Sequence, residues 1–277
     1  MLFATLLALA SAGLHATWNL VVKASADREL AAWGQWIAGA LLFLPVLIVA
    51  GFPERDAWPY LGASALVHVV YVYALVAAYT HGDFSLAYPL ARGGGALVAA
   101  VLGAWLLADD ALPLGAWIAL LVVAGGLASL VRPGAPGAEL GFALLTAVMI
   151  GAYTVIDTAG ARRSGNGFAY GCALVLCSGV TVSITALARG RGPALVASVP
   201  ANWRTYVGAG FCLTVAYSLV MVAVRHAPVG YVATLRESSV VIGALMGWLV
   251  LHEPLGRRRL MSSIVVLVGL VALIAFR

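Results

Sequence analysis

The chain has 277 residues, of which 63% are hydrophobic and only 10% carry a charge. Soluble domains contain roughly 45–50% apolar residues with glycine included, so this composition excludes a water-soluble fold and predicts a polytopic membrane protein. The net charge of +5 comes from basic residues that stand singly or in short clusters between apolar runs. This pattern marks membrane faces and does not indicate a nucleic-acid surface.

Apolar runs bounded by charges, prolines and loop-like glycines predict ten membrane-spanning helices. Each run is long enough to cross a hydrocarbon core of about 30 Å at about 1.5 Å per residue. The predicted spans are Leu2 to Val22, Leu30 to Ala50, Trp58 to Thr80, Phe84 to Leu107, Leu112 to Val131, Ala138 to Gly160, Gly167 to Ala188, Asn202 to Val224, Val229 to Leu251 and Leu260 to Phe276. They consume nearly the whole chain, so the predicted fold is all-α with short connections.

The two halves of the chain are weakly similar. A shift of 144 residues pairs Arg92 with Arg236 and Tyr73 with Tyr217. Five crossings per half would place the two copies in opposite membrane orientations, an inverted repeat that puts a substrate site between the halves. The alternative is chance similarity between apolar sequences. The predicted repeats are residues 1–132 and 133–277.

Three ionisable residues, Arg92, Arg236 and Glu237, fall deep inside predicted spans. A charge at the bilayer centre costs on the order of 2.5–3.5 kcal/mol, so each needs a partner or a wet cavity. The inverted repeat would bring the two arginines to opposite walls of one cavity, where guanidinium groups bind carboxylate or phosphate. Glu237 is expected to pair with one arginine or to couple protons. The alternative is that the arginines only hold helices together.

A polar aromatic stripe follows the first predicted span. His15, Trp18 and Asn19 share one helical face with Ser11, and the matching face of the sixth span carries Tyr153. We expect both faces to line the cavity. The alternative is the interhelical hydrogen bonding that polar side chains ordinarily provide in membranes.

The third predicted span adds His68, Tyr71 and Tyr79. Asp157, near the end of the sixth span, is expected to reach water, and the glycines at 93–95 are expected to serve helix packing rather than a local break. No zinc-ligand spacing, nucleophile-base pattern or phosphate-binding loop is found, so no catalytic residue, metal or cofactor is predicted. The predicted substrate-binding residues are Arg92, Arg236, Glu237, His15, Trp18, Asn19, His68, Tyr71, Tyr79 and Tyr153.

Three segments carry a resemblance to a known family. They are Leu14-His15-Ala16-Thr17-Trp18-Asn19 with Lys23, Tyr88-Pro89-Leu90-Ala91-Arg92-Gly93, and Gly247-Trp248-Leu249-Val250-Leu251-His252-Glu253-Pro254. With ten spans in two similar halves, the chain resembles EamA-type members of the drug/metabolite transporter superfamily. The resemblance implies alternating access around a cavity lined by the first, third, fourth, sixth, eighth and ninth helices, with the fifth and tenth peripheral. Bacterial relatives export amino acids, aromatic ones included, and other metabolites.

We therefore predict a secondary transporter of the bacterial inner membrane that exports amino acids or related carboxylates. Its expected partners are a small-molecule substrate and the lipid bilayer, with protons as a candidate coupling ion; monomer and homodimer stay open. One alternative is a proton-coupled exporter of cationic drugs, which needs unpaired membrane carboxylates. Another is a membrane-embedded enzyme acting on lipid-linked substrates, which needs a reactive constellation that the sequence does not display.

Overall fold

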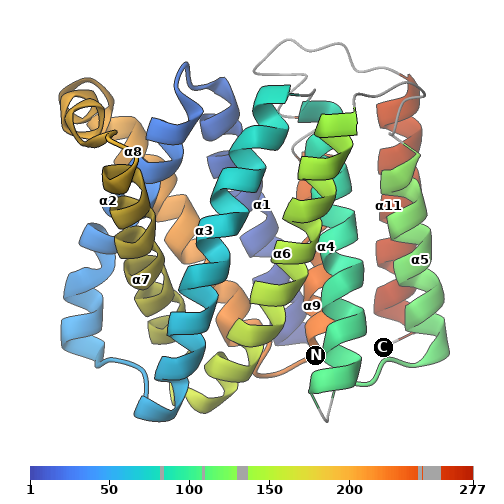
Figure 1. The fold of residues 1–277 in the computed structure, drawn as a ribbon. Coiled ribbons are helices and arrows are strands. Elements are labelled where there is room, and N and C mark those ends of the chain that lie inside the picture. The colour runs from blue at the N-terminus through green and yellow to red at the C-terminus, as the bar shows by residue number, and fades with distance from the viewer. Residues whose placement is uncertain (82–83, 108–109, 130–136, 243–244, 246–256, 277) are drawn as a thin grey trace.

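The computed structural model describes residues 1–81, 84–107, 110–129, 137–242, 245 and 257–276. Within these residues all regular structure is helical, as predicted, and no strand occurs. The helices run alongside one another in a single bundle, and the two chain termini lie at the same end of it (Figure 1). The helices are α1 Leu2–Ala24, α2 Arg28–Ala50, η1 Arg55–Ala57, α3 Trp58–His81, α4 Phe84–Leu106, α5 Leu114–Ala128, α6 Gly137–Arg163, α7 Gly167–Ala188, α8 Gly192–Ala223, α9 Val229–Leu235 and α11 Arg257–Ala275.

Six helical segments of the described chain are long and apolar enough to cross a membrane, judged by length and composition. They are Leu2–Ala24, Arg28–Ala50, Arg55–His81, Gly137–Arg163, Gly167–Ala188 and Gly192–Ala223. Shorter apolar helices cover Leu90–Leu106, Leu114–Gly126 and Ile264–Ala275. The chain is therefore a multi-pass membrane protein, and ten complete crossings stay a prediction. Much of the predicted ninth span, and the motif from Gly247 to Pro254, lie outside the described residues.

Helix boundaries follow local chemistry, and the predicted start of the eighth span is wrong. The Asp27 carboxylate caps α2 by accepting the Leu30 amide at 3.0 Å. Helix α8 begins at Gly192, well before the predicted start at Asn202. A proline in the first turn of α8 is compatible with a helix because no backbone donor is required there. The residues from Gly192 to Pro200, which lie between two predicted spans, are therefore the first turns of a long helix.

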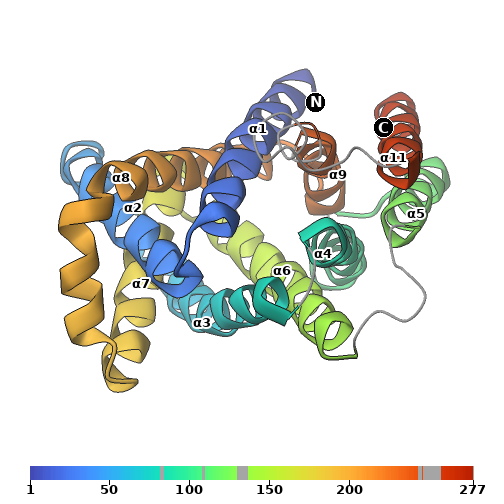
Figure 2. The same cartoon turned by 90° about the horizontal axis from the view of Figure 1, so that it is seen from above.

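Viewed along the bundle, α5 and α11 form a separate pair at one edge (Figure 2). The resemblance implies this peripheral place for the fifth and tenth helices. In the rest of the bundle, α1 packs on α8 and α3 packs on α6; α2 packs on both α7 and α8, while α4 contacts α6 and α9. Residues of α1, α3, α6 and α8 therefore meet in the interior.

Ion pairs tie the helix ends together at both ends of the bundle. At one end, Arg162 lies 2.6 Å from Asp110, whose other carboxylate oxygen accepts the Val229 amide at 3.0 Å. At the other end, Arg191 contacts Asp27 at 2.6 Å. Partial burial raises the pKa of Asp27, but hydrogen bonds from the Leu30 amide and from Arg191 outweigh it, so the pKa is lowered overall.

Helices α2 and α8 approach each other closely at a glycine pair. A Cβ atom added to Gly210 would lie 2.5 Å from the backbone nitrogen of Gly39 and 2.7 Å from the carbonyl oxygen of Gln35. Because these are backbone atoms, no side-chain rotation could relieve the overlap. The absence of a side chain at Gly210 is thus a packing requirement.

We expect Gly210→Ala to destabilise the protein by about 1–3 kcal/mol, the usual cost of overpacking, because the two helices must move apart. Gly208 lies on the same helix, is exposed, and has no atom within 4 Å of an added Cβ. Gly208→Ala should therefore keep the wild-type melting temperature or raise it slightly. Thermal unfolding of both variants in detergent tests this; equal melting temperatures would contradict it.

Candidate functional site

A small aromatic cavity lies in the interior of the bundle, where five helices meet. Its volume is about 10 Å³, which leaves room for about one water molecule. The lining residues are His15, Trp18, Trp36, His68, Tyr71, Tyr153, Leu213 and Tyr217. Five of the predicted site residues are thus brought together, from α1, α3 and α6. Trp36, Leu213 and Tyr217 were not among the predicted residues.

The aromatic rings of this cavity pack around the imidazole of His68. Its imidazole stacks on Tyr153 with centroids 4.2 Å apart and lies edge-on to Trp36 at 5.4 Å. The Nδ1 atom of His68 lies 2.9 Å from the carbonyl oxygen of Ser64. A carbonyl oxygen only accepts, so Nδ1 carries a hydrogen and donates to it. This bond and the stacked ring of Tyr153 hold the orientation of the imidazole.

Arg92 and Glu237 form a buried ion pair beside the cavity. Their side chains lie 2.9 Å apart, from Arg92 Nη2 to Glu237 Oε1, and are 5% and 1% exposed. The contact between α4 and α9 brings the two charges together. Of the two roles predicted for Glu237, the geometry shows the pairing with one arginine, and it is Arg92.

Arg236 has no such counter-charge. Within the described residues, no carboxylate lies within ion-pair distance of its guanidinium group. Its Nη2 lies 3.2 Å from His15 Nδ1, and its Cζ lies 6.0 Å from the centre of the Tyr217 ring. Arginine can only donate, so His15 Nδ1 accepts and the hydrogen of the neutral imidazole is on Nε2.

Several buried N–H groups around these arginines have no hydrogen-bond partner among the described residues. They are His15 Nε2, Trp18 Nε1, Arg92 Nε and Arg236 Nε. All four are donors, given the tautomer of His15. Glu237 Oε2 is a buried acceptor that likewise has no hydrogen-bond partner among the described residues. Because buried polar groups are normally paired, a cluster rich in unpaired donors suits a ligand that accepts hydrogen bonds.

The backbone after α9 is irregular at the two charged residues. Helix α9 ends at Leu235, and the amides of Ser239 and Val240 then bond to the carbonyls of Arg236 and Glu237, each at 2.9 Å. These bonds span three residues, so the chain is tightened there as in a 3₁₀ turn. In the first half, α4 runs unbroken through the glycines after Arg92, and an added Cβ on Gly95 would meet Ile150 of α6. Gly94, where an added Cβ would meet Ala147, and Gly95 serve packing, as predicted.

The remaining predicted residues, Asn19 and Tyr79, bond to each other next to the cavity. The Tyr79 hydroxyl donates to Asn19 Oδ1 at 3.1 Å, and Asn19 Nδ2 donates to the His15 carbonyl at 2.9 Å. They do not line the cavity. They fix the position of α1 relative to α3, which sets where His15 lies.

The expectation that Asp157 reaches water is wrong. Its residue is 0% exposed, and its carboxylate accepts hydrogen bonds from the hydroxyls of Tyr170, at 3.0 Å, and Tyr217. Helix α6 continues to Arg163, beyond the predicted end at Gly160, so Asp157 lies well inside the helix. Only the depth of the residue in the structure could show this.

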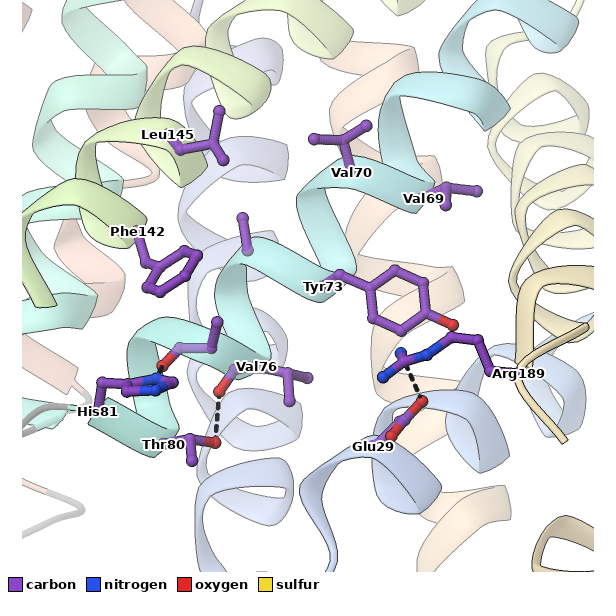
Figure 3. Close-up of a pocket in the computed structure, with 12 residues that line it drawn as sticks. Glu29, Val69, Val70, Tyr73, Val76, Thr80, His81, Phe142, Leu145 and Arg189 are labelled. Carbon is purple, nitrogen blue, oxygen red and sulfur yellow. Dashed lines mark hydrogen bonds and ion pairs between the residues drawn. The ribbon is translucent and has the colours of Figure 1, made fainter. Parts of the chain in front are cut away.

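A larger groove of about 600 Å³ lies on the flank of the bundle (Figure 3). Its walls are mostly aliphatic side chains of α3 and α6, such as Val70 and Leu145. Its polar groups are already engaged: Thr80 and His81 bond back to carbonyls of their own helix, and Arg189 pairs with Glu29 at 3.0 Å. The groove therefore offers little to a charged substrate.

Comparisons with known proteins agree with this architecture. Residues 138–275 match the model of the EamA-like transporter family. A comparison with curated proteins gives no significant sequence match. One crystal structure superposes with a TM-score of 0.78, covers 99% of both chains at 15% identity, and is one of 26 solved chains that match; at this identity the likeness shows the fold alone. The segment from α6 to α11 is thus similar to the EamA-like transporter family, and this supports membership of the drug/metabolite transporter superfamily of small-molecule transporters.

Proposed function

We propose that the protein exports small amino-acid-like carboxylates, aromatic ones in particular, across the bacterial inner membrane by alternating access. The observation that carries this proposal is Arg236, a buried guanidinium with no counter-charge among the described residues, set beside unpaired N–H donors and an aromatic cavity. A substrate carboxylate would supply both the missing charge and the missing acceptors. An aromatic side chain would pack among the surrounding rings.

Under this proposal, each residue of the candidate site has a role. Arg236 and His15 bind the carboxylate, while Trp18, His68, Tyr71 and Tyr153 form the walls against which the substrate side chain packs. Asn19 and Tyr79 hold α1 in place. The Arg92–Glu237 pair is charge-balanced and holds α4 against the segment that follows α9. A cavity of about 10 Å³ is too small for an amino acid, so the helices must separate for the substrate to bind.

The packing of the helices supports two inverted repeats, residues 1–132 and 133–277. Exchanging each helix with the one five places along, with α11 taken as the tenth, turns the α1–α8 contact into the α6–α3 contact. The same exchange turns α2–α8 into α7–α3 and leaves the α4–α9 and α5–α11 pairs unchanged. The family match covers one such half. Relative movement of the halves would open the cavity to each side in turn.

Counterflow in proteoliposomes tests this function. Vesicles containing the purified protein and loaded with unlabelled L-phenylalanine should accumulate labelled L-phenylalanine from outside. Phenylpropionate, which keeps the carboxylate, should compete, whereas phenethylamine, which lacks it, should not. Counterflow of a cationic dye with none of the carboxylates would overturn the proposal and favour a drug exporter. A cation is disfavoured by the uncompensated charge of Arg236.

A further inference from the structure

Asp157 is a buried carboxylate that the proposed binding of a carboxylate at Arg236 does not use. It accepts hydrogen bonds from two hydroxyl groups, on two helices: Tyr170 of α7 and Tyr217 of α8. In the described part of the chain, no basic group lies within ion-pair distance of it. A carboxylate inside the membrane whose only partners are neutral hydrogen-bond donors is costly in free energy when it is ionised. It is therefore a candidate site for binding a proton or another cation.

One of these two hydroxyls, on Tyr217, connects Asp157 to the wall of the cavity. The ring of Tyr217 lines the cavity and has the Arg236 guanidinium 6.0 Å from its centre, while its hydroxyl donates to Asp157. The uncompensated cation and the uncompensated carboxylate are therefore the two neighbours of one tyrosine.

The following charged and titratable groups, on α6 or on elements packed against it, form no ion pair with Asp157. Helix α3 presents His68, and α6 itself carries Tyr153, stacked on it. Helix α4 carries Arg92, which is engaged by Glu237 beyond α9. The charged residues of η1, Arg55 and Asp56, are exposed.

We propose that Asp157 is a shared binding site for a proton and for the ammonium group of the substrate, so that the two bind in alternation. This rests on the proposed function. A zwitterionic amino acid would place its carboxylate at Arg236 and its ammonium at Asp157, with Tyr217 moving aside between them. The occupied cavity then carries balanced charges. Without substrate, a proton neutralises Asp157, and the empty site carries the single positive charge of Arg236.

This alternation couples transport to the proton gradient in a defined direction. The substrate-loaded site is neutral, so the change from the inward-open to the outward-open state moves no net charge against the membrane potential. The empty protonated site carries one positive charge, and both the potential and the proton gradient of a bacterial inner membrane favour its return towards the cytoplasm. Each exported zwitterion is thereby exchanged for one proton. By linkage, lowering the pH must weaken zwitterion binding, up to about tenfold per pH unit where Asp157 is protonated.

Proton release on substrate binding tests the proposal. L-Phenylalanine added to the purified protein in weakly buffered detergent solution at acidic pH should release about one proton per molecule bound, read with a pH indicator. Phenylpropionate has no ammonium and should bind without release. Asp157→Asn should abolish the release, whereas Glu29→Gln, the same chemical change in an ion pair at the end of the bundle, should leave it intact.

Each outcome decides between the two proposals. Counterflow of L-phenylalanine without proton release, or with proton uptake, overturns the role of Asp157 and leaves the exporter standing. Equal release by L-phenylalanine and phenylpropionate also overturns it, and this comparison uses the wild-type protein, so it holds even if the Asp157 variant fails to fold. Absence of counterflow with both compounds overturns the exporter itself.

Discussion

Arg236→Ala is expected to abolish L-phenylalanine counterflow while leaving the protein folded. The guanidinium group offers two hydrogen bonds to the substrate carboxylate, each to a charged group and each contributing about 1.5–3 kcal/mol. Their loss corresponds to about two to four orders of magnitude in affinity. Since Arg236 has no acidic partner among the described residues, its removal leaves no carboxylate stranded.

Two further variants sharpen this experiment. Arg236→Lys keeps the charge and loses the forked geometry, so it should retain weak counterflow. Arg204→Ala removes an exposed arginine that lies over Trp203, and counterflow should stay at the wild-type level. Wild-type counterflow by Arg236→Ala, with a wild-type melting temperature, would show that this arginine binds no substrate.

The sequence was sufficient to predict the all-helical membrane fold because lipid imposes a simple constraint. Runs such as Gly167–Ala188 show directly as stretches without charge. The prediction failed where prolines were taken to bound a span. Pro193 and Pro200 make the residues after Gly192 resemble a connection, yet α8 runs through them, with Pro193 in its first turn and Pro200 inside the helix.

The candidate site was partly predictable, for a related reason. Arg92, Arg236 and Glu237 stand out because charge inside a membrane requires an explanation. Which arginine pairs with Glu237 depends on the contact between α4 and the segment after α9, and no local pattern encodes it. Trp36 and Tyr217 line the cavity, but an aromatic residue in an apolar span carries no signal of which neighbour it faces.

Removing Glu237 is expected to destabilise the protein more than removing its partner Arg92. Breaking a buried ion pair costs about 3–5 kcal/mol because it leaves one charge uncompensated. Glu237, left alone by Arg92→Met, can take up a proton and become neutral. Arg92, left alone by Glu237→Met, cannot lose its charge, and Arg236 nearby also lacks a counter-charge. Glu237→Met should therefore lower the melting temperature in detergent more than Arg92→Met does.

The double variant Arg92→Met with Glu237→Met separates charge balance from substrate binding. Replacing both members of a buried pair by apolar side chains is often neutral or stabilising by about 1–4 kcal/mol, so the double variant should be more stable than either single one. If the pair only holds α4 against the segment after α9, counterflow should recover with stability. A stable double variant without counterflow would instead place Arg92 or Glu237 in direct contact with the substrate, and equal destabilisation by the two single variants would contradict the charge argument.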